Sequence, residues 1–337
     1  MKFGHLKPDE AEDCILAHSV RLKETVLKKG TVLNQEAIRL LNASQVGSVM
    51  AARLEEGDVG EDEAAGRIAR AIFGAHVTVD APFTGRANIV SERAGVFVAD
   101  EGRIKDLNRI DEAITVATLN PFSRVEKGQM VATVKIIPFS VPNKQVLELE
   151  TITEERSRDI SVSPFRGLNA GLILSRLPGD KDTVIEKRQR AVAERITALG
   201  GILEKITCCE HSKDAVVSAI GQAHRDGLEL ILLFGASAIV DRADVIPAAL
   251  TRAGGEVLHL GMPVDPGNLL LYGKIAEVQV VGIPSCASSI KENGFDWVLE
   301  RIFADLPLGR EDFISMATGG LLKEIPSRPQ PREGVAI

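Results

Sequence analysis

Three short segments of the sequence combine glycine with proline or with hydroxyl side chains. They run over residues 235–247, 261–268 and 282–289. Glycine lets a ligand approach the backbone closely, and the free N–H groups at the start of a helix attract phosphate. Each segment therefore predicts a loop that could hold part of an anionic ligand.

The first loop offers the clearest chemistry. Gly235 permits close approach to the backbone, Ser237 supplies a hydroxyl group, and a helix is expected to follow. Alternatively, Asp244 only caps that helix while Pro247 occupies its first turn.

The other two loops suit different parts of a ligand. Two prolines and two glycines make the second loop a rigid turn, whose amides and Asn268 could bind a flat heterocycle, although a plain long turn explains it equally well. The third is a hydroxyl-rich turn before a helix. There Cys286 is interpreted as a packing residue, because no base is fixed beside it. The predicted ligand contacts are Gly235, Ala236, Ser237, Pro263, Asp265, Pro266, Gly267, Asn268, Gly282, Pro284, Ser285 and Ser288.

The elements that must position these loops alternate regularly in the C-terminal half. Apolar runs over 172–174, 202–207, 228–234, 256–260 and 278–283 predict strands, and helical patterns cover 182–199, 212–224, 247–252 and 295–304. This alternation predicts an α/β fold, a doubly wound parallel sheet, over residues 167–309. Ligands bind beyond the carboxyl ends of such strands, so the three loops should share one edge.

The sequence outside residues 167–309 shows other patterns. Short apolar runs between 77 and 137, after helices over 35–43 and 62–73, predict a separate N-terminal region, 1–140, with small β-rich modules. Prolines and glycines around a charged middle predict a linker over 141–166, and 310–337 is interpreted as a C-terminal tail. Six acids within 55–63 fit a solvated helix start better than a metal site, and the turn at 84–88 fits a hairpin with a solvent-facing Arg86 better than an anion site.

Composition excludes several classes of function. The 337 residues carry a net charge of −7 and only 4% aromatics, which disfavours a nucleic-acid surface. No apolar run approaches the roughly 20 residues of a membrane span, and the N-terminus lacks a signal core, so a cytoplasmic protein is expected. Four cysteines in this length form no disulfide framework.

Two further features are expected at the rim of the predicted sheet. His211 could be a phosphate or metal ligand, but it fits a polar residue beside a helix start better, because no second ligand is spaced for a metal. The basic helix over 181–195 is by default a solvated face, although Lys187, Arg188 or Arg190 could attract a phosphate.

The order and spacing of the three loops resemble the molybdopterin-binding domain shared by molybdopterin adenylyltransferases and molybdopterin molybdenumtransferases. The resemblance covers about 171–306: a strand, glycine-serine loop and helix start over 230–245, Gly-x-Pro-x-x-Pro-Gly over 261–267, and a glycine-proline turn over 282–285. His211 stands where the family usually has aspartate, Asn268 replaces a frequent lysine, and the family's Asp-Gly-aromatic-Ala motif is absent. The chain therefore resembles a divergent branch.

The resemblance implies a protein of molybdenum cofactor biosynthesis that binds molybdopterin or its nucleotide form. If the protein is a transferase, adenylyl or molybdenum transfer would need Asp244, with Asp241, to hold a metal such as Mg²⁺. The implied partners are a nucleotidyltransferase or a molybdoenzyme apoprotein, and a second copy in a homodimer. Two alternatives stay open: a non-catalytic carrier or insertion chaperone, which His211 favours, and a nucleotide or ADP-ribose hydrolase of the competence-damage type.

Overall fold

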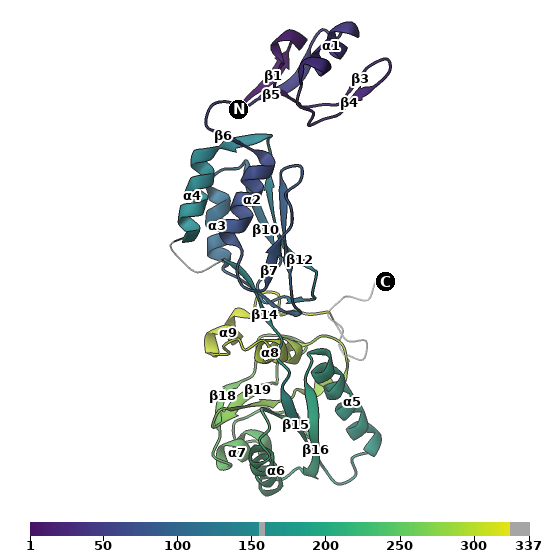
Figure 1. The fold of residues 1–337 in the computed structure, drawn as a ribbon. Coiled ribbons are helices and arrows are strands. Elements are labelled where there is room, and N and C mark those ends of the chain that lie inside the picture. The colour runs from purple at the N-terminus through teal and green to yellow at the C-terminus, as the bar shows by residue number, and fades with distance from the viewer. Residues whose placement is uncertain (155–158, 324–337) are drawn as a thin grey trace, which may run out of the picture. The chain divides into compact units, whose positions relative to one another are not determined.

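The structure is a computed structural model that describes residues 1–154 and 159–323 (Figure 1). The chain forms two compact units that divide between Pro164 and Phe165. The first unit is rich in small sheets and the second is an α/β layer, as the sequence predicts. No helix within the described ranges is both long and apolar enough to cross a membrane.

The first unit begins with a small antiparallel sheet in the order β1-β5-β2, with a helix and a hairpin beside it. The apolar core of this part includes Leu16, Leu33 and Leu41, all fully buried. Its elements are β1 (Lys2–Leu6), η1 (Pro8–Glu10), β2 (Ile15–Leu16), β3 (Val20–Arg21), β4 (Val26–Leu27), α1 (Gln35–Ala43) and β5 (Val49–Arg53).

The remainder of the first unit packs three helices and three further sheets around a second core. Alternate residues of β8 are buried, which is the pattern of a strand with one face on the core. The elements are β6 (Asp58–Gly60), α2 (Glu61–Ile72), β7 (Val77–Val79), β8 (Arg86–Ser91), β9 (Gly95–Ala99), α3 (Glu101–Arg109), β10 (Ile114–Thr118), β11 (Arg124–Val125), β12 (Met130–Ile136), β13 (Ser140–Pro142), α4 (Asn143–Glu154) and β14 (Ile160–Pro164).

The expected linker over 141–166 is wrong. Helix α4 packs against α2 and buries Val146 and Leu149, three residues apart on one face. The Arg67 guanidinium of α2 donates to both carboxylate oxygens of Glu150, at 2.9 and 2.7 Å. Strand β14 pairs with β9. Two of the prolines that suggested a linker, Pro142 and Pro164, are instead the last residues of strands β13 and β14.

The second unit has a six-stranded sheet in the order β16-β15-β17-β20-β19-β18. Five strands run in one direction and β19 runs against them. The sequence reasoning missed β19, because the turn that joins it to β20 is Ala276-Glu277 and lacks the Asn-Gly type of hairpin signal. The strands are β15 (Asn169–Arg176), β16 (Ile202–Glu210), β17 (Leu230–Phe234), β18 (Glu256–Leu260), β19 (Leu271–Ile275) and β20 (Val278–Gly282).

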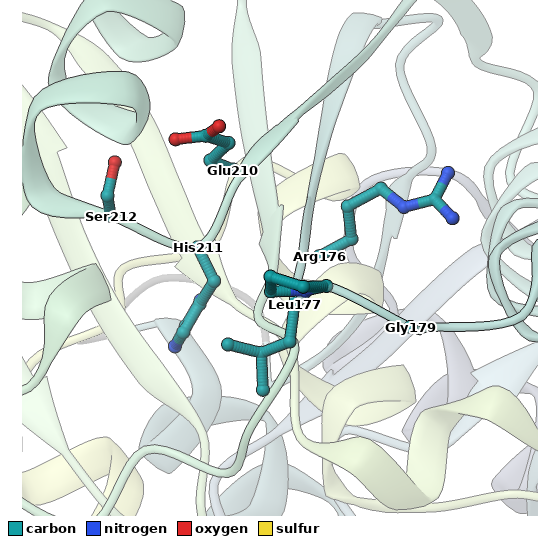
Figure 2. A pocket seen from close by; sticks show the side chains of 7 residues that line it. Arg176, Leu177, Gly179, Glu210, His211 and Ser212 are labelled. Carbon is teal, nitrogen blue, oxygen red and sulfur yellow. The ribbon is translucent and has the colours of Figure 1, made fainter.

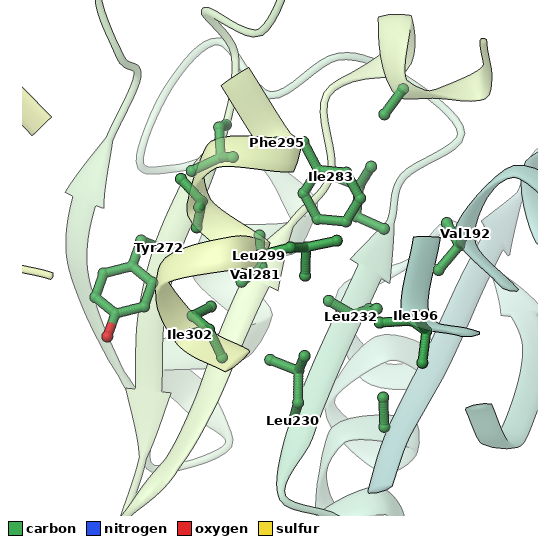
Figure 3. Close-up of a cluster of buried hydrophobic side chains, with 14 of the residues drawn as sticks. Val192, Ile196, Leu230, Leu232, Tyr272, Val281, Ile283, Phe295, Leu299 and Ile302 are labelled. Atoms are coloured by element: carbon green, nitrogen blue, oxygen red, sulfur yellow. The ribbon is translucent and has the colours of Figure 1, made fainter. Parts of the chain in front are cut away.

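Helices cover both faces of this sheet. Helices α5 (Asp182–Ala198) and α8 (Gly294–Phe303) share one core with Leu230 and Leu232 of β17 (Figure 3). Helices α6 (Lys213–Arg225) and α7 (Val245–Arg252) share another core with Ile231 and Leu233. Every residue of β17 is buried, as expected for a strand between two helical layers.

The expected tail over 310–337 is wrong in its described part. Helix α9 (Arg310–Ser315) buries Phe313, whose ring stacks on His259 with centroids 4.2 Å apart. Beyond this helix, the Asp265 N–H donates to the Gly320 carbonyl at 2.8 Å, and the Leu322 N–H donates to the Asp265 carbonyl at 3.0 Å. Residues 324–337 lie outside the described part.

Candidate functional site at the carboxyl edge of the sheet

The three predicted loops begin at the same edge of the second unit's sheet. Gly282 at the end of β20 pairs with Leu233 of β17 and with Leu271 of β19. Leu271 in turn pairs with Leu260, the last residue of β18. Gly235 and Gly261 directly follow β17 and β18, so all three loops leave from one edge.

The topology predicts a crevice between the ends of β15 and β17. The chain leaves β15 towards α5 on one face, whereas it leaves β17 towards α7 on the other face. Such a divergence between neighbouring parallel strands is the usual place for a ligand in an open α/β sheet. The first loop lies at this point.

Ser175, His211 and Ser237 form a hydrogen-bonded chain at the crevice. The Ser175 Oγ lies 2.8 Å from Nδ1 of His211, and Nε2 of His211 lies 3.2 Å from the Ser237 Oγ. The Ala236 N–H donates to the Ser175 Oγ at 3.2 Å. Ser175 is buried, whereas Ser237 is exposed. The chain therefore connects the end of β15 with the first loop.

Arg188 reaches the same loop from α5. Its Nη1 donates to the Gly235 carbonyl at 3.3 Å, and its guanidinium carbon lies 4.7 Å from the centre of the Phe234 ring. Burial lowers the pKa of this half-buried guanidinium. Among residues 1–154 and 159–323, no carboxylate lies within ion-pair distance of it. Of the three cations that the sequence suggested, Arg188 is placed at the loop, whereas Lys187 and Arg190 are exposed.

An open pocket of about 430 Å³ adjoins His211 at the ends of β15 and β16 (Figure 2). Arg176 on its wall donates to the Asp182 carboxylate at 3.0 Å and to the Asp180 carbonyl at 2.7 Å. Figure 2 shows the His211 ring pointing away from the Glu210 side chain. The pocket residues are Arg176, Leu177, Pro178, Gly179, Glu210, His211 and Ser212.

His211 favours its neutral form. Burial lowers the pKa of the imidazole, and the opposing attraction of the Asp244 and Asp180 carboxylates is smaller. His211 directly precedes Ser212, which caps α6 by accepting from the Ala215 N–H at 3.4 Å. Its bonds to two serines give it a role at the rim that the sequence alone does not show.

Asp244 and Asp241 close turns of the first loop. The Asp244 Oδ2 accepts from the N–H groups of Val240 at 2.7 Å and Asp241 at 3.0 Å, and these bonds lower its pKa. The Asp241 Oδ1 accepts from the Ala243 N–H at 2.7 Å. Asp244 stands at the N-cap position of α7, yet its side chain makes no capping bond. In the described part of the chain, no group of three or more His, Cys, Asp or Glu could hold a metal ion.

The second loop is held mainly by bonds to other parts of its own unit. The Gly294 N–H at the start of α8 donates to the Pro266 carbonyl at 2.8 Å, and the Asp265 N–H donates to the Gly320 carbonyl at 2.8 Å. Pro266 and Gly267 are buried, Asp265 is half-buried, and Pro263 and Asn268 are exposed. The loop thus supports α8 and the segment at Gly320, with only two of its predicted contacts open to a ligand.

Arg195 of α5 holds the backbone of the third loop. The Arg195 guanidinium donates to the carbonyls of Ala287 at 2.9 Å and Ser289 at 2.7 Å. Ser288 donates its hydroxyl to the Ser285 carbonyl at 2.9 Å. Pro284 is buried, Ser285 is exposed, and Gly282 sits under Ile239 of the first loop. Burial raises the pKa of the Cys286 thiol, which suits the packing role expected for it.

Two features of the first unit have structural roles. Thr84 and Gly85 both have positive φ, and Phe83 and Arg86 exchange backbone hydrogen bonds across them, so the segment is a two-residue hairpin turn. The Gly85 N–H already donates to Asp62, while Arg86 is exposed. In the acidic run, Glu55 and Asp58 pair with the N-terminal amine of Met1.

Sequence reasoning missed Ser175 and Arg195. Ser175 is the single hydroxyl in the buried part of β15 and stands one residue from its end, a position that could have marked it as a rim residue. Arg195 had no such signal, because it belongs to a run of charges typical of a solvated helix.

Comparison with known proteins adds three solved structures at low identity. No family model and no curated protein matches the chain. A molybdopterin biosynthesis MoeA protein from Pyrococcus horikosii shares 14% identity over 73% of this chain and 79% of its own, with a TM-score of 0.32. A molybdopterin biosynthesis protein from Mycobacterium abscessus shares 15% identity over 41% of this chain and 92% of its own, with a TM-score of 0.29. A MogA structure shares 13% identity over 45% and 97%, with a TM-score of 0.26.

The chain is similar in fold to these solved structures of molybdopterin biosynthesis proteins.

Proposed function

We propose that the second unit binds molybdopterin, or its nucleotide form, at the crevice between β15 and β17, with the phosphate against the first loop. The chain would then be a molybdopterin-binding protein of molybdenum cofactor biosynthesis. One observation carries the proposal: an Arg188 guanidinium without a carboxylate partner in the described ranges touches the loop that exposes the Ser237 hydroxyl.

The cost of burying charge supports an anionic ligand. A half-buried guanidinium loses hydration. Among the described residues of its unit, 165–323, Arg188 recovers only one carbonyl bond and a contact with the Phe234 ring. A phosphate would give it a charge-assisted partner, and the exposed Ser237 hydroxyl would add a second bond. The neutral His211 adds no negative charge to oppose the anion.

We propose binding, rather than metal-assisted transfer, as the activity of this crevice. The residues present do not fit a metal site, because Asp244 and Asp241 each use a carboxylate oxygen to hold the loop backbone. Asp244→Asn should therefore leave ligand affinity within about threefold. If the carboxylate instead holds a metal during transfer, the same variant should bind normally but lose transfer activity by orders of magnitude.

Mass spectrometry of small molecules released from the purified protein tests the ligand class directly. A pterin bearing a phosphate or a nucleotide is expected, and its absence from protein isolated from cells that make the cofactor would count against the proposal. Calorimetric titration with the recovered pterin then tests the site.

The variants for that titration are Arg188→Gln and Ser237→Ala. Each removes a donor to a charged acceptor, which is worth about 1.5–3 kcal/mol, or roughly 10- to 150-fold in affinity. Arg190→Gln on the exposed side of α5 is the matched control and should change little. If all three variants bind the pterin as tightly as the wild type does, the first loop is not part of the binding site.

A further inference from the structure

The hydrogen bonds that join Ser175, His211 and Ser237 can all donate in the same direction, from the buried end of the chain towards the exposed Ser237. We propose that Ser175 and His211 are positioning residues that turn the Ser237 hydroxyl hydrogen outwards, as a donor to an anionic oxygen of the ligand. The inference rests on the proposed function for the identity of that oxygen, which belongs to a phosphate group. The direction of the bonds rests on the protein alone.

The direction starts at Ser175. A serine hydroxyl has one hydrogen to donate and two lone pairs to accept. The Ala236 N–H uses one lone pair of the Ser175 Oγ. Within the described part of the chain, the other neighbour of this oxygen at hydrogen-bond distance is Nδ1 of His211, 2.8 Å away. Ser175 is 1% exposed, so its hydrogen lacks an acceptor unless it points at Nδ1.

The tautomer of His211 follows from that bond. If Nδ1 accepts from Ser175, the neutral ring carries its hydrogen on Nε2. Nε2 then donates to the Ser237 Oγ, 3.2 Å away. That bond leaves the Ser237 hydrogen unused, no acceptor for it lies among residues 1–154 and 159–323, and the side chain is exposed. The donors thus follow one another towards the solvent in the order Ala236 N–H, Ser175 hydroxyl, His211 Nε2–H and Ser237 hydroxyl, and each hydrogen bond polarises the next.

This order defines what the Ser237 hydroxyl can do. As a donor it suits an oxygen that only accepts, such as those of a phosphate. As a nucleophile it would need an unprotonated Nε2 to take its proton, and the chain places a hydrogen on that nitrogen. The arrangement therefore assigns Ser237 to binding, and it disfavours a serine hydrolase built on His211.

Nuclear magnetic resonance of the ring nitrogens in the ligand-free, full-length protein tests the order without any ligand. The six histidines are separated by comparison with His211→Gln. Wild type at pH 7.5 should show the Nε2–H form of His211, and Ser175→Ala should shift it to a mixture of both tautomers. Ser288→Ala, which removes a hydroxyl bonded elsewhere in the same unit, should leave the signal unchanged. An Nδ1–H form in wild type would overturn the inference.

Titration with inorganic phosphate tests the outward donor. His211→Gln can keep an N–H near the position of Nε2 and should bind phosphate within about threefold of wild type. His211→Leu should bind at least tenfold more weakly, and so should Ser237→Ala. Equal binding by the Gln and Leu variants would overturn the positioning role of His211.

The two proposals fail in different ways. The Nε2–H form together with no phosphate binding by wild type would overturn the ligand class while the hydrogen-bond order stands. Tight binding of phosphate and of the recovered pterin together with the Nδ1–H form would overturn the order while the proposed function stands.

Discussion

Replacing Arg195 should destabilise the second unit more than any other change of a single charge on α5. Arg195 is 8% exposed, and all five N–H groups of its guanidinium have acceptors. Nε donates to the Asp296 carboxylate at 2.6 Å, Nη1 to the carbonyls of Ala191 at 3.0 Å and Ala287 at 2.9 Å, and Nη2 to those of Ser289 at 2.7 Å and Lys291 at 3.2 Å.

The loss of stability can be estimated from the buried acceptors that lose their donor. Arg195→Met keeps the length of the side chain but leaves the Asp296 carboxylate and the carbonyls of the third loop without their donor. Removing one partner of a buried ion pair costs about 3–5 kcal/mol. For a unit of this size, that loss lowers the melting temperature by roughly 6–20 °C. Arg195→Lys keeps the charge but not the planar fork, so an intermediate loss is expected.

Trp297 makes the measurement specific to the second unit. It is the only tryptophan of the chain and lies in α8, next to Asp296. Urea unfolding followed by tryptophan fluorescence therefore reports the unit that contains Arg195. Arg190→Met, at an exposed position of the same helix, is the control and should change stability by less than about 0.5 kcal/mol. A loss in Arg195→Met no larger than in this control would refute the reasoning.

Three further predictions concern single positions. Thr84→Asn should raise the stability of the first unit by about 0.5–1 kcal/mol in calorimetry, because Thr84 is β-branched with φ +50° and Asn-Gly suits this hairpin turn; a lower stability would contradict it. In Gly235→Ala the new Cβ would lie 2.8 Å from the Ser237 carbonyl oxygen, so the loop must shift, and phosphate titration should show at least a tenfold loss of affinity. Because burial holds the pKa of folded His211 below its ordinary value of about 6.5, the unfolded chain binds more protons near that pH; stability should fall as the pH drops through 6.5, and His211→Gln should flatten this slope in urea unfolding.

The second unit could be predicted from sequence because its signals agree with one another. Strand β18 and helix α5 were located to within a residue, since apolar runs and helical spacing coincide with glycine stops. The range over 141–166 failed for the opposite reason. Its prolines and charges suggest a linker, while the burial of Val146 and Leu149 against α2 depends on contacts that no local pattern shows.

The candidate site was predicted in its loops but not in its contacts. Glycine-rich loops after strands are visible in a sequence, and their common edge follows from the topology. Which side chains then meet is decided by the register of β15 against β16 and β17, and that register brings Ser175 to His211 and Ala236. The second and third loops begin at the same edge, yet the second loop's backbone bonds to α8 and to the segment at Gly320, and two carbonyls of the third loop accept from Arg195 of α5.

A histidine at position 211 bears on the kind of ligand that this rim can hold. The proteins that this chain resembles usually carry an aspartate at the aligned position, and an ionised aspartate only accepts hydrogen bonds. A neutral histidine whose Nδ1 accepts from Ser175 instead donates towards Ser237. Compared with an ionised aspartate, a neutral histidine carries no negative charge at the rim and can donate a hydrogen bond to Ser237. Both features favour an anion beside Arg188, so the histidine fits a site that holds a phosphate firmly better than one that must gather a metal ion around it.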